Sequence, residues 1–72
     1  MRLPVLGWKE VSKILIEIGY QPSRTRGDHM NFVKHACKTV TVQMKKELSD
    51  GNLLSIIRST GLTKDEFLEH LK

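Results

Sequence analysis

The sequence predicts an α+β domain with the order helix, two or three antiparallel strands, helix and short helix. Apolar residues recur every three or four positions near both ends of the chain and alternate with polar residues in the middle. Segments that contain glycine or proline separate these patterns. The 72 residues are enough for one domain, which we expect to span residues 1–72.

Residues 7–18 are predicted to form the first helix, because their apolar positions share one face. These positions are Trp8, Val11, Ile14, Leu15 and Ile18. Gly19 follows and suits the left-handed conformation that often ends a helix. Residues 20–24 contain Pro22, which has no backbone N–H donor, so a strand here must be an edge strand or begin after the proline.

Residues 25–28 include Gly27 and predict a tight turn that leads into two antiparallel strands. In both strands the apolar residues alternate, which is typical of a sheet with one buried face. They are Met30 and Phe32 in the first strand, and Val40, Val42 and Met44 in the second. If both main helices cover these residues, the opposite face stays open. That face would carry His29, Asn31, Val33 and His35, level with Thr39, Thr41 and Gln43.

The C-terminal third predicts two further helices. Asn52 is the expected N-cap of the first, which buries Leu53, Ile56 and Ile57 and ends at Gly61. The last helix has two start signals, a capping box and a hydrophobic staple. The box pairs Thr63 with Glu66, and the staple pairs Leu62 with Phe67. Its inward face is predicted to hold Phe67, Leu68 and Leu71.

The charges are unevenly distributed along the chain. Twelve Lys and Arg face eight Asp and Glu, but between positions 24 and 46 six basic residues face Asp28 alone. A basic stretch of this kind indicates either a surface that meets phosphates or an ordinary solvated face. The longest apolar run, residues 14–16, is too short for a membrane span or a signal peptide. With the single Cys37, which excludes an internal disulfide, this favours a cytoplasmic protein.

His29 is the strongest candidate for chemistry, because it follows the glycine turn on the predicted open face and histidine exchanges protons near neutral pH. The alternative is a surface histidine without a role, and Asp28 beside it would either favour its protonated form or only initiate the turn. His29, His35 and Cys37 lack the spacing of a zinc site. No phosphate-binding glycine loop or magnesium-binding carboxylate cluster occurs, so we expect no cofactor. RNA suits such a site, because its own 2′-hydroxyl can attack the phosphate once a base removes the proton.

The run from Arg24 to Phe32, with Gly27 and His29 inside it, resembles the Arg-x-x-Gly-Ser-His-x-x-Phe segment of HicA-type toxins, the RNA-cleaving half of the HicA and HicB toxin–antitoxin pairs. The similarity extends to residues 9–20 and 40–57 and to the tail that begins at Gly61. It implies a double-stranded-RNA-binding-domain-like fold with a three-stranded sheet, and an mRNA interferase that is inhibited by a HicB-type antitoxin. His29 matches the active histidine of the family.

Three positions depart from the family pattern. Asp28 replaces the usual serine, Gln43 replaces a common proline, and Lys45 stands where histidine is frequent. Asp28 would either orient His29 and make it more basic or weaken RNA binding. A second proton-transfer residue is then left to Lys45, Lys46 or His35.

Together these observations predict a metal-independent endoribonuclease that cleaves mRNA with His29 as general acid or base. Its phosphate-binding residues would be Arg24, Arg26, Lys45 and Lys46. Two alternatives use the same basic stretch. One is an RNA-binding module of the same fold without catalysis, and the other is a protein-interaction domain that binds an acidic partner.

Overall fold

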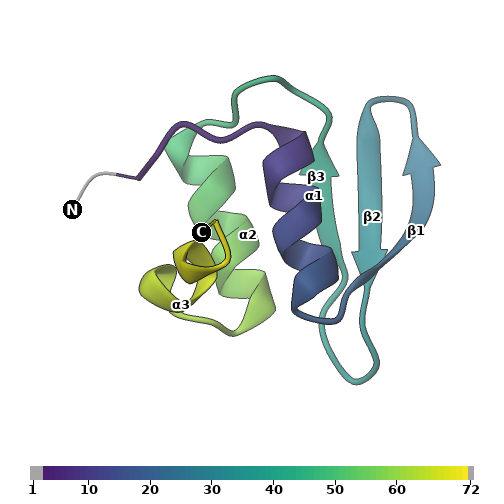
Figure 1. Ribbon diagram of the computed structural model, residues 1–72. Coiled ribbons are helices and arrows are strands. Elements are labelled where there is room, and N and C mark those ends of the chain that lie inside the picture. Colours follow the sequence, from purple (N-terminus) through teal and green to yellow (C-terminus); the bar gives the residue numbers. More distant parts are fainter. Residues whose placement is uncertain (1–2, 72) are drawn as a thin grey trace.

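The computed structural model describes residues 3–71 and has the predicted α+β architecture (Figure 1). The chain forms α1 (Trp8–Glu17), β1 (Gln21–Arg26), β2 (His29–Val33), β3 (Val40–Gln43), α2 (Asp50–Thr60) and α3 (Lys64–Glu69). The helix, three-stranded sheet, helix and short C-terminal helix therefore occur in the expected order. No helix within the described residues is long and apolar enough to cross a membrane.

The three strands form one antiparallel sheet in the order β1-β2-β3. β1 is an edge strand that contains Pro22, as predicted, and a bulge shifts its register between Pro22 and Thr25. Arg26 pairs with His29 across a two-residue turn, Gly27 and Asp28. Gly27 has φ +61° at the first turn position, where a type II′ turn requires a positive φ. The glycine therefore allows the short turn that fixes the register of the hairpin.

The first helix begins and ends as the sequence predicts. Gly7 is the N-cap, and its N–H donates to the Glu10 carboxylate at 2.8 Å. Gly19, with φ +105°, follows the helix, and the Lys34 ammonium donates to the Ile18 carbonyl at 2.7 Å. Lys34 therefore satisfies a carbonyl at the end of α1, where a positive charge also suits the helix dipole.

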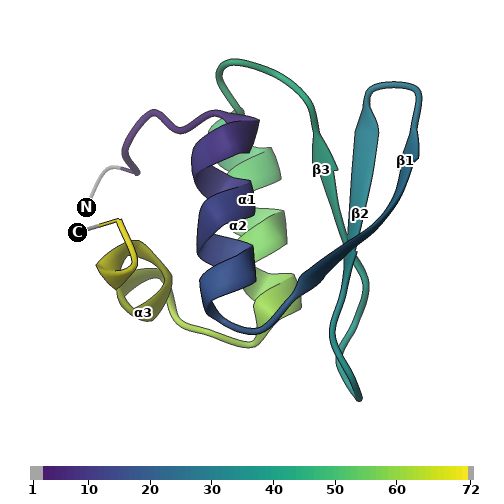
Figure 2. The same ribbon diagram turned by 45° about the vertical axis from the view of Figure 1, so that its right-hand side comes forward.

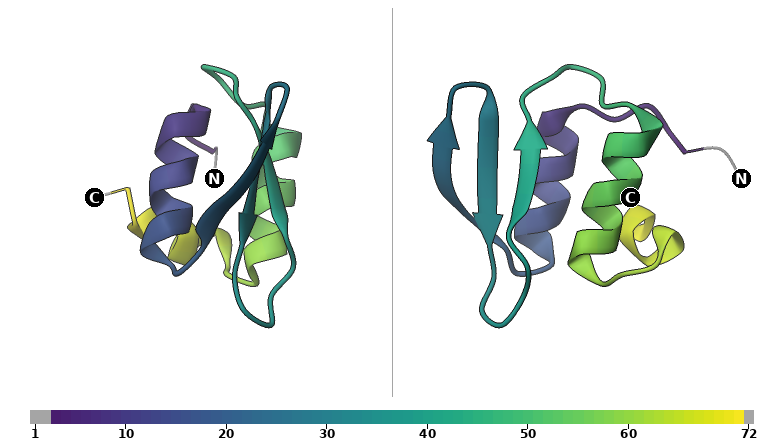
Figure 3. Two further views of the ribbon diagram at one scale, coloured as in Figure 1. Left: turned by 90° about the vertical axis from the view of Figure 1, so that its right-hand side faces the viewer. Right: turned by 180° about the vertical axis from the view of Figure 1, so that it is seen from behind.

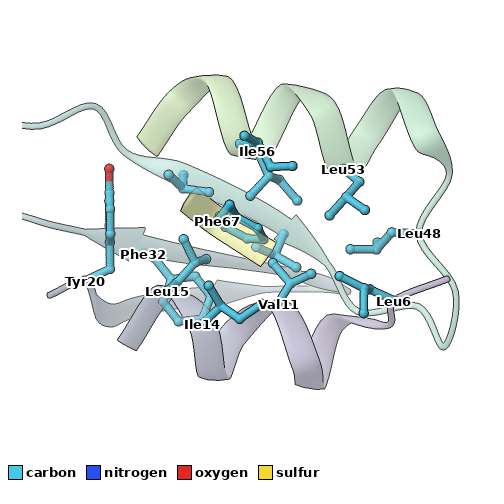
Figure 4. Close-up of a cluster of buried hydrophobic side chains, with 13 residues drawn as sticks. Leu6, Val11, Ile14, Leu15, Tyr20, Phe32, Leu48, Leu53, Ile56 and Phe67 are labelled. Atoms are coloured by element: carbon cyan, nitrogen blue, oxygen red, sulfur yellow. The ribbon is translucent and has the colours of Figure 1, made fainter. Parts of the chain in front are cut away.

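One cluster of buried side chains joins the helices to the sheet (Figure 4). The strands contribute Phe32, Val40 and Val42, and Met30 is partly buried against them. The helices contribute Val11, Ile14, Leu15, Leu53, Ile56, Ile57 and Phe67. Leu6, Tyr20 and Leu48 are also buried, although no sequence pattern marked them. Burial raises the pKa of Tyr20, with a smaller contribution from Cys37, so its hydroxyl stays neutral at physiological pH.

The second helix begins three residues earlier than predicted. Ser49, not Asn52, is its N-cap, and the Ser49 hydroxyl accepts a hydrogen bond from the Asn52 N–H at 3.2 Å. Both residues are good caps, and the choice between them depends on where the chain turns after β3. The end of the helix is as predicted, with Gly61 in the left-handed conformation at φ +79°.

The last helix has the predicted capping box between Thr63 and Glu66. It places Phe67 in the core with none of its surface exposed. The prediction that Leu71 faces inward is wrong, because α3 ends at Glu69 and Leu71 is 41% exposed. Lys72 lies outside the described residues.

The arrangement of the elements brings one set of chain segments to the same end of the molecule. α1 and α2 lie beside β3, while β1 and β2 project away from them (Figure 2). Both helices begin at the end where β3 finishes and where the β1–β2 turn lies, as the two views of Figure 3 confirm. We call this the N-cap end, because it contains Gly7 and Ser49, the N-caps of α1 and α2.

Thr63→Ala is expected to lower the free energy of unfolding by about 1 kcal/mol at neutral pH, because it removes the cap that holds α3 and Phe67 in place. Hydrogen bonds from the Thr63 backbone and side chain lower the pKa of Glu66 below 4.5. The cap is therefore fully stabilising above that ordinary value and weakens as the pH falls through the lowered one. Urea unfolding across this range should show the difference between wild type and variant shrinking in acid. The exposed Thr39, which caps no helix, provides the matched control Thr39→Ala. An equal loss in both variants would contradict the role of the cap.

Candidate active site

His29 is the first residue of β2 and lies at the N-cap end of the molecule. Its neighbours across the sheet are Arg26 on β1 and Gln43 on β3. Directly paired residues share a face, so these three side chains form a row across the sheet. The next residues of β2 and β3, Met30 and Val42, pair on the opposite face, toward the core. The His29 side chain is 46% exposed, as its predicted position on the open face requires.

Asp28 contacts one nitrogen of the imidazole ring. Its Oδ1 atom lies 3.0 Å from His29 Nδ1, and its side chain is 69% exposed. The two residues are adjacent in sequence, and the short turn brings the carboxylate to the ring. Asp28 therefore both occupies the second turn position and lies in contact with the imidazole ring.

Gln43 contacts the other ring nitrogen. The side-chain nitrogen of Gln43 lies 3.4 Å from His29 Nε2, and its oxygen accepts a hydrogen bond from the Asn52 side-chain amide at 3.2 Å. Asn52 is on the first turn of α2, so the second helix supports the imidazole through one intermediate residue. Ser49 caps the helix, which leaves the Asn52 side chain available for this contact.

These contacts select one tautomer of the neutral ring. Because the Gln43 oxygen accepts from Asn52, its NH₂ group faces His29. A carboxylate only accepts, so in the neutral ring Nδ1 carries the proton that faces Asp28, and the NH₂ group of Gln43 then meets the lone pair of Nε2. In this tautomer Nε2 has a lone pair directed away from Asp28, the form that a general base requires.

Two of the predicted phosphate-binding residues lie on β1. Arg26 ends the strand opposite His29, and Arg24 lies in the bulge two residues earlier. Both side chains are exposed. β1 therefore places positive charge along the edge of the sheet beside the histidine.

The other two, Lys45 and Lys46, follow β3 and are exposed at the N-cap end. The Trp8 N–H donates to the Lys45 carbonyl at 3.0 Å, which attaches this segment to α1. Gly7 is required there, because a Cβ atom at this position would overlap the Lys46 carbonyl oxygen. The backbone contact holds both lysines next to the start of α1.

The basic stretch does not form one continuous patch. Lys34 is hydrogen-bonded to the end of α1, and Lys38 adjoins the α2 residues Arg58 and Ser59. His35 and Cys37 are exposed in the loop between β2 and β3. The rise of β2 places this loop ~13 Å or more from His29. His35 is therefore too distant to share a proton transfer with His29. Within residues 3–71, no three His, Cys, Asp or Glu side chains are grouped so that they could hold a metal ion.

The sequence patterns singled out His29 as a candidate but did not predict which residues contact its Nε2 atom. Strand alternation placed Gln43 on the same face, and this was a usable signal. Asn52 gave none, because its residue type and position favoured a capping role.

The family model described as the HicA toxin of bacterial toxin–antitoxin systems matches residues 8–62. The match extends from the first residue of α1 to the residue before the α3 cap, and it includes His29 and all four proposed phosphate-binding residues. No curated protein matches the chain. Since the matched segment is well over half of its length, the chain belongs to the HicA toxin family of bacterial toxin–antitoxin systems.

Proposed function

We propose that this toxin is a metal-independent endoribonuclease that cleaves mRNA in the cytoplasm, with His29 as its general acid and base. The observation that carries the proposal is the held imidazole: an exposed ring whose Nδ1 lies 3.0 Å from the Asp28 carboxylate and whose Nε2 lies 3.4 Å from the Gln43 side-chain nitrogen. Such a group suits a substrate that supplies its own nucleophile. The RNA 2′-hydroxyl is that nucleophile, and it needs only the removal of its proton.

The reaction follows from the available groups. His29 Nε2 takes the proton of the 2′-hydroxyl, and the oxygen attacks the adjacent phosphorus as the bond to the 5′-oxygen of the next nucleotide breaks. The proton then passes from the imidazolium to the leaving 5′-oxygen. The products are a 2′,3′-cyclic phosphate and a 5′-hydroxyl, and no proton is lost or gained. General acid–base catalysis of this kind contributes about 10²- to 10⁴-fold.

The arginines and lysines supply binding rather than proton transfer. Arg26 lies opposite His29, and Lys45 and Lys46 are attached to the same end of the molecule. Cationic side chains on phosphates provide affinity without reading sequence, and they make binding sensitive to salt. Asp28 approaches the imidazole from Nδ1, so its carboxylate holds the ring without occupying Nε2.

His29→Ala is expected to reduce cleavage of a mixed RNA substrate by at least about 100-fold. The fold should persist, because an exposed side chain is replaced away from the core. The measurement is the rate of cleavage by purified protein in EDTA, with circular dichroism to confirm the fold. His35→Ala changes an exposed histidine at the other end of β2 and should cleave like wild type. Wild-type activity in His29→Ala, or loss of cleavage in EDTA, would refute the proposal. RNA that binds tightly but is never cut would indicate the binding module instead.

Gln43→Glu is expected to reduce cleavage more than Gln43→Ala, by roughly tenfold or more relative to wild type. The carboxylate would accept a hydrogen bond from a protonated Nε2 and so favour the forms of the ring in which this nitrogen cannot act as a base. Imidazole ¹⁵N chemical shifts would report the tautomer directly. Thr41→Val, on the same face but bonded to Asn31, is the matched control. Equal rates and unchanged shifts in Gln43→Glu would show that the contact does not orient His29.

The family context extends the proposal to an inhibitor. RNA can reach His29 only if the N-cap end is accessible. A HicB-type antitoxin is therefore expected to inhibit cleavage by covering this end and masking His29. Co-expression of the toxin with a HicB-type antitoxin should yield a stable complex without nuclease activity, and removal of the antitoxin should restore cleavage. In the complex, His29 should be protected from diethylpyrocarbonate while His35 reacts. Protection of neither residue would place the antitoxin elsewhere.

A further inference from the structure

A groove of about 400 Å³ opens beside the start of α1, outside the row formed by Arg26, His29 and Gln43. Its lining consists of Gly7, Trp8, Lys9, Glu10 and Lys46. Trp8 is partly buried against the core and partly exposed, so the groove presents indole surface to solvent. An aromatic side chain with one accessible part and flanking lysines is a typical platform for a nucleic acid base.

The charges of the groove favour an anionic ligand. Lys9 and Lys46 are exposed, and the Lys9 ammonium lies over the Trp8 ring, 5.9 Å from its centre, so a base that stacks on the indole must displace this ammonium to the side. Among the described residues of the lining Glu10 is the only acid, and its carboxylate already accepts the Gly7 N–H at 2.8 Å. The groove therefore offers one aromatic ring and two cations, the combination that accepts a base together with the phosphate beside it.

Backbone hydrogen bonds connect this groove to the candidate active site. Trp8 N–H donates to Lys45 O at 3.0 Å, and Lys45 N–H donates to Gln43 O at 2.9 Å. Gln43 in turn contacts His29. Gly7 brings the backbone of α1 so close to Lys46 that this wall of the groove is fixed. The groove and the imidazole are thus held on neighbouring segments of the same end of the molecule.

We propose that the groove at Trp8 is an RNA-binding subsite in which the indole stacks on an unpaired base while Lys9 and Lys46 contact the flanking phosphates. This inference rests on the proposed ribonuclease function and deepens it, because it commits the enzyme to single-stranded substrate. A base paired within a helix is stacked on its neighbours and cannot lie against the indole. Cleavage should therefore be restricted to loops and unpaired regions of mRNA.

The chain offers a direct probe, because Trp8 is its single tryptophan. In the non-cleaving variant His29→Ala, a short single-stranded RNA should quench Trp8 fluorescence. An oligonucleotide of equal length and charge that lacks bases should bind through its phosphates without comparable quenching. The same RNA annealed to its complement should quench much less. Equal quenching by the base-free strand would overturn the subsite.

Binding measured by polarisation of a labelled RNA provides the second test. Trp8→Leu, which keeps an apolar side chain against the core, should weaken binding of single-stranded RNA roughly five- to a hundredfold and leave binding of the base-free strand unchanged. Trp8→Phe should retain part of the affinity. Lys46→Ala should weaken binding of both strands, whereas Lys13→Ala, an exposed lysine on α1 outside the groove, is the charge-matched control.

The outcomes separate this inference from the function on which it rests. If wild type cleaves RNA through His29 but Trp8 is neither quenched nor needed for affinity, the subsite is wrong and the nuclease proposal stands. If RNA quenches Trp8 fluorescence as expected but the wild-type protein does not cleave RNA, the subsite is confirmed and the nuclease proposal fails. Unfolding of Trp8→Leu would not prevent the test, because the quenching experiment uses the native tryptophan.

Discussion

The pleat of the sheet is the constraint on which the candidate site depends. Side chains alternate along a strand. Burial of Phe32 and Val42 therefore forces His29 and Gln43, which pair with each other, onto the other face. Truncating a buried phenylalanine typically costs about 3–5 kcal/mol, far more than any preference of a surface histidine. The core therefore determines where the imidazole lies, and the chemistry requires no strained backbone at His29.

The two-residue turn between β1 and β2 fixes which residues of the two strands lie opposite each other. A one-residue slip between β1 and β2 would move every side chain of the shifted strand to the opposite face. Gly27 allows the short connection, and Arg26 consequently lies directly across from His29. The backbone of the turn is also bonded to the residue that follows β3, because the Asp28 carbonyl accepts a hydrogen bond from the Met44 N–H at 2.7 Å. The turn is therefore held from β3 as well as from β1.

The sequence predicted those features that depend on local patterns. Alternation identified the faces of β2 and β3, and the capping box located the start of α3, because both signals involve residues only two or three positions apart. Prediction from the sequence failed for features that depend on packing between residues far apart in the chain. Ser49 and Asn52 are equally good caps locally, and the path of the chain after β3 decides between them. Tyr20 is buried because the loop after β2 and the end of α2 cover it, with its hydroxyl 3.4 Å from the Lys38 carbonyl.

The same division between local and distant contacts applies to the candidate site. Asp28 is next to His29 in sequence, so its contact with Nδ1 requires only the turn. Gln43 reaches Nε2 only after β3 pairs with β2, and its orientation is fixed only after α2 packs and presents Asn52. The unfolded chain therefore holds the histidine beside an acid but leaves its tautomer undefined. Folding of the sheet and second helix adds the contact between Gln43 and Nε2, so the geometry of the candidate site depends on tertiary structure and not on the histidine motif alone.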